Sequence, residues 1–272
     1  NILKKNKNFK FFKIDLSNKS SLDKALKNIK LEYVVNLAAQ AGVRYSITNP
    51  DEYLSSNLIG FCNLLNIIKK KKIKHFLFAS TSSVYGISKS KAFKEDHPAV
   101  FPIQFYAATK RSNELIAHSY SYLYKIPSTA LRFFTVYGPW GRPDMALFKF
   151  TSNILKGKSI DVYNYGRMFR DFTYVDDVVD GISIVIGNKI NPKTPYQIFN
   201  IGSNKPTSLR KFIYHLEKEL KLKAKVKLKS LQKGDVIKTH ASISKLQGFK
   251  PSTSLSQGII NFINWYKKYY KF

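Results

Sequence analysis

The sequence is poor in cysteine and in long apolar runs. Cys62 is the single cysteine among 272 residues, so an internal disulfide and a cysteine-based metal cluster are excluded, and we expect Cys62 to be a small buried hydrophobe. No apolar run approaches the roughly 20 residues that span a bilayer. Residues 1–10 also lack the apolar stretch of a secretory signal. We therefore expect a soluble, cytoplasmic protein that holds no metal.

Glycine is also absent before Gly42. A dinucleotide-binding fold normally opens with a strand, a glycine-rich turn and a helix, because only glycine lets backbone amides come close to a pyrophosphate. The chain begins with Asn1 rather than methionine. We therefore expect the first βαβ unit of such a fold to be missing, and cofactor affinity to be impaired if the chain is the whole protein.

Acidic residues are few, since 17 Asp and Glu stand against 46 Lys and Arg, for a net charge of +29. Such a charge favours nucleic acid or an anionic membrane surface only where it is clustered. The lysines instead recur in short runs along the whole chain, for example at 69–72, 221–229 and 267–271. Basic runs are weak motifs, so we favour a general lysine bias and expect no nucleic-acid or membrane partner. A non-catalytic basic binding protein stays open as a distant alternative.

Apolar segments rich in β-branched and aromatic residues alternate with helical patterns. Strands that are apolar on both faces and are separated by helices predict a parallel sheet covered on both sides. The pattern therefore predicts the α/β class with a doubly wound, Rossmann-like parallel sheet. The expected strands are 9–16, 33–39, 75–81, 128–134 and 196–201, and the expected helices are 20–29, 51–70, 106–124, 209–220 and 255–270.

The pattern loosens after Gly138, where two prolines and a further glycine mark a break. Shorter mixed elements follow, which indicates a second, smaller α/β domain for the substrate. We expect residues 1–135 and 172–201 to form the dinucleotide-binding domain, incomplete at its N-terminus. Residues 136–171 and 202–272 are expected to form the substrate-binding domain.

Tyr106 and Lys110 carry the central chemical signal. A spacing of four residues places the phenol and the ammonium on one face of the predicted helix. Tyrosine has a reference pKa of about 10 and is a poor base at neutral pH, so a nearby cation is needed to favour the phenolate. A pair at this spacing is common by chance, and by itself it favours an ordinary surface pair.

A cluster of hydroxyls stands twenty-five residues upstream of Tyr106, at Ser80, Thr81, Ser82 and Ser83. It directly follows an apolar strand, and the C-terminal ends of strands are where α/β sheets bind ligands. The alternative is a turn that only caps the next helix. Together with Tyr106 and Lys110, the cluster matches the Ser/Thr, Tyr and Lys triad of short-chain dehydrogenases.

The chain resembles the extended short-chain dehydrogenase/reductase family of NAD-dependent epimerases and dehydratases, and within it the UDP-glucuronate 4-epimerases. The similarity extends through essentially the whole chain, and the missing glycine-rich turn is the departure. The segments that carry it are 36–46, the Thr81 cluster, 106–110, 132–145, 170–177 and 234–236.

The resemblance implies NAD as cofactor and a UDP-sugar as substrate, inverted at C4 through a 4-keto intermediate. Thr81, Tyr106 and Lys110 would be the catalytic residues. Arg170 would bind the diphosphate, since its planar, permanently charged fork suits phosphate oxygens. The residues expected to contact the cofactor are Asp15, Leu16, Leu37, Ala38, Ala39, Gln40, Asn57, Tyr106 and Lys110.

Ser83 guides the choice of substrate. Related dehydratases and decarboxylases commonly place a glutamate before Val-Tyr-Gly, and here that position is Ser83. Oxidation of glucuronate at C4 makes a β-keto acid that loses carbon dioxide readily, so an epimerase must hold the carboxylate out of alignment. The substrate contacts expected for this task are the hydroxyls of Ser82, Ser83 and Thr135 and the cation of Arg142.

UDP-glucuronate, converted to UDP-galacturonate, is therefore the expected substrate. A UDP-glucose 4-epimerase, or an epimerase of another nucleotide sugar, stays open. The resemblance further implies a homodimer paired through the helices beginning near Asp51 and Tyr106, and a role in polysaccharide biosynthesis.

Overall fold

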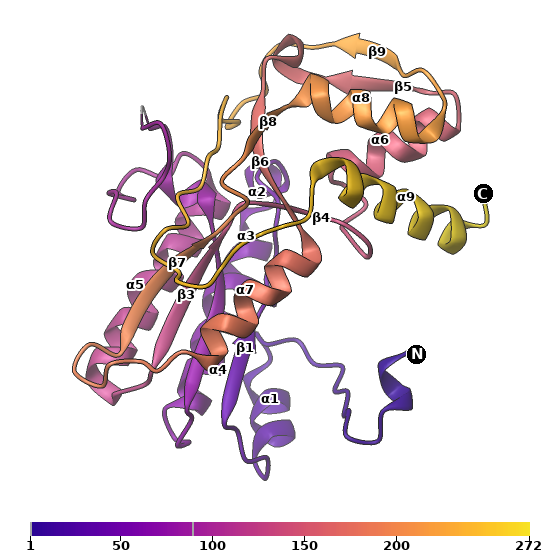
Figure 1. Ribbon diagram of the computed structural model, residues 1–272. Helices are drawn as coiled ribbons and strands as arrows, with labels where there is room; N and C mark the ends of the chain where they lie inside the picture. The colour runs from indigo at the N-terminus through magenta and orange to yellow at the C-terminus, as the bar shows by residue number, and fades with distance from the viewer. Residues whose placement is uncertain (1, 89) are drawn as a thin grey trace. The chain divides into compact units, whose positions relative to one another are not determined.

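The computed structural model describes every residue except Asn1 and Lys89 (Figure 1). Its contacts divide the chain into two compact units. The first contains the chain up to Ala79, together with Gln104–Thr129 and Ile190–Gln197. The second contains Ser80–Ile103, Ala130–Lys189 and Ile198–Phe272. The assignment of cofactor and substrate to the two expected domains stays a prediction.

A four-stranded sheet has the order β1-β2-β3-β7, with β1 at Tyr33–Asn36, β2 at His75–Thr81, β3 at Ser128–Phe133 and β7 at Tyr196–Ile201. Strands β1 and β2 are parallel, in a register that runs from Tyr33 opposite His75 to Asn36 opposite Phe78. Phe76, Leu77 and Phe78 have no exposed surface, as a strand covered on both faces requires. The expected class, α/β with a parallel sheet, is confirmed.

Helices of the first unit follow the predicted pattern with one refinement. The first is a single 3-10 turn, Leu3–Lys5. The expected helix at 51–70 contains a π-helical segment at Leu54–Ile59, between α3 (Pro50–Tyr53) and α4 (Gly60–Ile68). Such segments are rare and often mark functional sites. The other helices are α1 (Lys19–Leu26), α2 (Tyr45–Thr48) and α5 (Phe105–Tyr124).

The prediction of a strand at 9–16 is wrong. None of these residues forms a strand, and the side chains of Phe11 and Phe12 are exposed. Strand geometry is held by backbone hydrogen bonds to a neighbouring strand. Strand β1 is the edge of the described sheet, and residues 9–16 do not pair with it. The phenylalanine-rich composition of 9–16 is therefore not enough to order this segment as a strand.

The second unit is also mixed α/β and contains more residues than the first. One sheet has the order β4-β6-β8 (Thr135–Tyr137, Phe169–Tyr174, Pro206–Ser208), with β4 and β6 parallel and β8 antiparallel to β6. A second sheet pairs β5 (Ser159–Val162) with β9 (Lys225–Leu228) in parallel. Its helices are α6 (Ala146–Leu155), α7 (Val175–Gly187), α8 (Leu209–Leu220) and α9 (Leu255–Tyr270), with 3-10 turns at Ser82–Tyr85 and Tyr163–Gly166.

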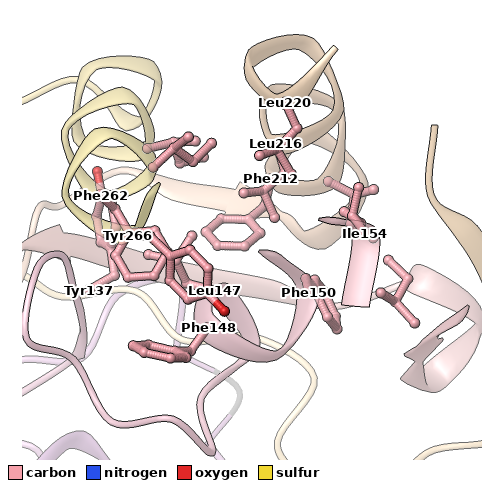
Figure 2. Close-up of a cluster of buried hydrophobic side chains, with 14 of the residues drawn as sticks. Tyr137, Leu147, Phe148, Phe150, Ile154, Phe212, Leu216, Leu220, Phe262 and Tyr266 are labelled. Atoms are coloured by element: carbon pink, nitrogen blue, oxygen red, sulfur yellow. The ribbon is translucent and has the colours of Figure 1, made fainter. Parts of the chain in front are cut away.

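An aromatic core holds this second unit together (Figure 2). Phe148 of α6, Phe212 of α8 and Phe262 of α9 are buried in it, and each contributes about 1.5–3 kcal/mol relative to an exposed side chain. A Cβ atom added to Gly258 would lie 2.2 Å from the Tyr137 hydroxyl, so glycine at this position lets α9 approach β4. Along the part of the chain that the structure describes, no helix is both long and apolar enough to cross a membrane.

Candidate active site

Tyr106 stands in the first turn of α5, where other residues of the first unit fix its backbone and ring. Its amide N–H donates to the Ser46 hydroxyl at 3.2 Å. Its ring packs edge-on against Tyr53, with centroids 6.0 Å apart. The side chain is half-buried, so one part of the ring is supported and the rest is accessible to a ligand.

Lys110 follows one helical turn later on α5 and is 4% exposed. Burial lowers the pKa of its ammonium to about 8, and the negative charge of Glu114 opposes this shift only in part. Glu114 is itself buried and paired with Arg111 at 2.7 Å. The structure therefore confirms that Tyr106 and Lys110 share one helix. It also buries the ammonium of Lys110, so that its charged form is poorly stabilised by the surrounding protein.

Asn57 connects this helix to the loop that follows β1. Its side-chain oxygen accepts from the Gln40 N–H at 2.8 Å, and its amide nitrogen donates to the Gln40 carbonyl at 3.0 Å and to the Thr109 hydroxyl at 3.1 Å. The Asn113 amide donates to the Asn57 carbonyl. Asn57 is 2% exposed, so the structure gives it a positioning role, and direct contact with the cofactor stays a prediction.

The loop from Leu37 to Gln40 is fixed at both ends while its apolar side chains point outward. The Asn36 side chain accepts from the Ala38 N–H at 3.1 Å, and Asn57 holds Gln40. Leu37 is 54% exposed, Ala38 is exposed and Ala39 is half-buried. The run is therefore not buried sheet core, and the loop presents small side chains to a ligand.

Asp15 and Leu16 lie in a turn held against α4. The Asp15 carboxylate accepts from the N–H and hydroxyl of Ser17, both at 2.8 Å, and the N–H bond lowers the pKa of Asp15. The buried Asn63 amide donates to the carbonyls of Leu16 and Ser17 at 3.0 Å. Glycine at 60 lets Leu16 pack closely, since an added Cβ atom would lie 3.0 Å from the Leu16 Cβ. Their contact with the adenine stays a prediction.

Thr81, Ser82 and Ser83 lie together in the second unit, where β2 turns into the 3-10 helix Ser82–Tyr85. The Thr81 hydroxyl caps this helix by accepting from the Ser83 N–H at 3.2 Å. Tyr85 fixes the other end by donating to the Asn200 side-chain oxygen at 2.7 Å. Capping uses one lone pair of Thr81, and its O–H remains able to donate, so the capping and catalytic readings are compatible.

Thr135 and Arg142 line one small cavity of the second unit, together with Tyr137, Met145 and Phe262. The structure therefore brings together two of the predicted substrate contacts. Arg142 is held by Asp144, which accepts from its Nε at 3.0 Å and from its Nη2. Burial opposes ionisation of Asp144, but the Arg142 guanidinium lowers its pKa overall. This bidentate pair leaves the Nη1 donors of Arg142 for other partners.

Arg170 is half-buried on β6, and its Nη1 donates to the carbonyls of Phe169 at 2.9 Å and Ile237 at 3.1 Å. Backbone contacts of this kind fix the direction of the guanidinium. Its binding to a diphosphate stays a prediction.

Asp171 is a buried acidic residue beside Arg170 that the sequence analysis did not single out. It is completely buried and accepts from the N–H and hydroxyl of Ser203 at 2.6 and 2.8 Å and from the Ala241 N–H at 2.9 Å. It thereby ties two loops to β6, next to Arg170. A charged residue inside an apolar strand was the signal that could have revealed it.

A comparison with family models matches residues 2–202 to the NAD dependent epimerase/dehydratase family. The chain belongs to this family. Among its relatives is a probable UDP-glucuronate 4-epimerase of Rhizobium meliloti, 43% identical over 99% of this chain and 84% of that one.

Two solved structures resemble the chain closely. One is the UDP-glucuronic acid 4-epimerase of Bacillus cereus in complex with UDP-glucuronic acid and NAD, with a TM-score of 0.92, 35% identity, and coverage of 99% of this chain and 85% of that one. The other is the UDP-glucose 4-epimerase of Thermotoga maritima with UDP-glucose, with a TM-score of 0.90, 28% identity, and coverage of 97% and 86%.

The residues present fit the family's cofactor, NAD. The ammonium of Lys110 is buried at a cost that the protein offsets only in part, and ribose hydroxyls are acceptors that would solvate it. The exposed, small side chains of the loop from Leu37 to Gln40 allow a flat dinucleotide to lie close. Lys110 and this loop could therefore hold NAD, and a contact of the Asp15 turn with the cofactor stays a prediction.

Proposed function

We propose that this protein interconverts UDP-glucuronate and UDP-galacturonate by inverting C4 of the sugar. The observation that carries the proposal is helix α5, which presents the half-buried phenol of Tyr106 and, one turn later, the buried ammonium of Lys110. The names of the relatives support the substrate, since a 43% identical protein and a solved neighbour both carry UDP-glucuronate 4-epimerase in their names.

Tyr106 is the proposed base. As a phenolate it takes the proton of the sugar 4-hydroxyl, and it returns a proton to the same oxygen after C4 has been inverted. When bound, NAD supplies a reversible hydride acceptor for C4. The ammonium of Lys110 stabilises the phenolate and donates to the ribose, and Thr81 donates a hydrogen bond that orients the reacting hydroxyl.

The proposed carboxylate contacts are neutral hydroxyls supported by one cation. Ser82 and Ser83 lie on the turn that Thr81 and Tyr85 fix, and Thr135 shares a cavity with Arg142. Hydroxyl donors can hold a carboxylate at a fixed angle to the ring. This orientation protects the β-keto acid from losing carbon dioxide. Arg170 is proposed to bind the diphosphate.

A UDP-glucose 4-epimerase is the second candidate, favoured by the neighbour that was solved with UDP-glucose. UDP-glucose carries a neutral hydroxymethyl where glucuronate carries a carboxylate, so it gains nothing from the charge of Arg142. The balance of turnover between the two substrates therefore separates the candidates.

The test is incubation of the purified protein with NAD and each UDP-sugar, followed by chromatographic separation of the C4 epimers. We expect UDP-glucuronate to be converted faster than UDP-glucose. Tyr106→Phe is expected to lose turnover and keep UDP-glucuronate binding in a calorimetric titration, because only the proton acceptor is removed. A folded, NAD-binding protein that converts neither sugar would contradict the proposal, and wild-type rates in Tyr106→Phe would remove the base assignment.

We further propose that the protein is a cytoplasmic homodimer that supplies UDP-galacturonate for polysaccharide biosynthesis. Large apolar side chains are exposed on the π-helical segment and on α5, with Ile59 at 53%, Leu115 at 56% and Tyr122 at 67%. Exposed apolar groups of this size favour a second copy as partner. Light scattering is expected to give a dimer mass, and Leu115→Asp is expected to shift it towards the monomer.

A further inference from the structure

A strained turn carries the loop that bears Arg142. The Gly141 N–H donates to the Gly138 carbonyl at 3.2 Å, which closes a four-residue turn with Pro139 in its second position. Trp140 occupies the third position with φ +62°. Proline before a left-handed residue defines a type II turn, which favours glycine at that third position. A bulky aromatic residue is strained there, so contacts elsewhere must hold Trp140 in place.

Those contacts come from helix α9. The ring of Trp140 lies 5.2 Å from the ring of Trp265 at 57°, and 5.2 Å from the ring of Tyr269 at 78°. Trp265 and Tyr269 are four residues apart on one helix face, and their rings stack 5.3 Å apart. Trp140 is 64% exposed, and the rings of Trp265 and Tyr269 are its aromatic contacts among the described residues.

The pair on α9 is itself anchored in the aromatic core of the second unit. Trp265 contacts Phe148 with centroids 6.0 Å apart and Phe262 at 5.6 Å, and Figure 2 shows both phenylalanines within the core. Phe148 and Phe262 also line the cavity of Thr135 and Arg142. The core thus connects α9 to both ends of the loop at 138–145.

We propose that Trp140, Trp265 and Tyr269 form an aromatic clamp that positions the loop 138–145, and with it Arg142, for the carboxylate of a uronic-acid nucleotide. The proposal rests on the proposed function, because it takes Arg142 as a carboxylate contact. The three aromatic residues are positioning residues, since they act on the substrate through the loop. A strained turn held by a few ring contacts is easily released, so removal of the clamp is expected to alter binding more than chemistry.

Two variants separate the ring contacts from the backbone shape. Trp140→Gly provides the residue that the turn prefers and removes the ring, whereas Trp265→Leu keeps Trp140 and removes its partner. We expect both to raise KM for UDP-glucuronate by up to about tenfold, the equivalent of one aromatic contact, with little change in kcat. The KM for UDP-glucose is expected to change less. Tyr214→Ala, an exposed aromatic on α8, is the matched control and should behave as wild type.

A spectroscopic measurement tests the clamp independently of turnover. Trp140 and Trp265 are the two tryptophans of the chain, and indoles in contact couple their electronic transitions. Trp140→Phe and Trp265→Phe each retain one indole, and the double variant retains none. The circular dichroism of the protein should therefore differ from the sum of the two single-variant spectra minus the spectrum of the double variant. A spectrum equal to that combination would show that the clamp does not form.

The failures of the two proposals are distinguishable. If the unaltered protein converts neither UDP-sugar, the proposed function fails. The circular-dichroism comparison with Trp140→Phe and Trp265→Phe then still decides whether the clamp exists. If the protein is active and Trp140→Gly keeps the wild-type KM for UDP-glucuronate, the turn is sufficient without the ring and the clamp is overturned.

Discussion

Replacement of Lys110 by methionine is expected to abolish activity and to stabilise the fold. Burial lowers the pKa of Lys110 from its usual 10.5 to about 8, and each tenfold change in a protonation equilibrium corresponds to about 1.4 kcal/mol. The charged form is therefore destabilised in the folded protein by roughly 3 kcal/mol at neutral pH. Methionine fills a similar volume without a charge, so we expect a gain of about 1–3 kcal/mol in the free energy of unfolding.

The pH dependence of stability provides a second signature of the same residue. Because the folded pKa of Lys110 lies below its unfolded value, the unfolded chain binds more protons between about pH 8 and 10.5. The stability that Lys110 contributes therefore rises with pH across this window. Urea unfolding of wild type and Lys110→Met at several pH values measures this, and the difference between the two proteins should shrink as the pH increases.

Lys218→Met, at an exposed position on α8, is the control for loss of a lysine, with an expected effect within about 0.5 kcal/mol. Two results would refute the reasoning about Lys110. Epimerase turnover that survives in Lys110→Met would show that the cation is not needed by the phenolate or the cofactor. A loss of stability in that variant would show that the ammonium is well solvated within the fold.

Three further substitutions test other parts of the site and fold. Ser83→Glu is expected to weaken UDP-glucuronate binding by like-charge repulsion and to affect UDP-glucose binding less. If calorimetry gives the variant and the wild type the same affinity for UDP-glucuronate, Ser83 is not a carboxylate contact. Asp171→Asn places an amide donor among the N–H donors of Ser203 and Ala241 and should lower the free energy of unfolding by about 2 kcal/mol. An unchanged free energy of unfolding would show that these hydrogen bonds do not stabilise the fold. Gly258→Ala forces a methyl group against Tyr137, and thermal unfolding should show a free energy of unfolding lower by about 1–3 kcal/mol. Gly187→Ala, with open space around the added methyl group, should leave the free energy of unfolding unchanged.

Helices and buried strands with strong periodicity were predictable because their own residues select them. The bounds of β2, β7, α8 and α9 agree with the sequence analysis to the residue. Strands β2 and β7 are short apolar runs, whereas the apolar positions of α8 and α9 repeat at the helix period and both helices begin at serine caps. The segment 9–16 had the same local character and formed no strand, because pairing depends on a neighbour that local sequence does not provide.

The sequence by itself determined the class of the fold and, through the four-residue spacing of Tyr106 and Lys110, that a phenol and an ammonium share one helix face. Tertiary structure decided what no spacing reveals, namely the burial that lowers the pKa of Lys110 and the three hydrogen bonds of Asp171. It also decided the packing of Trp140 on α9. Helix periodicity is a local property of consecutive residues, whereas burial and long-range contacts depend on which distant segments meet when the chain folds.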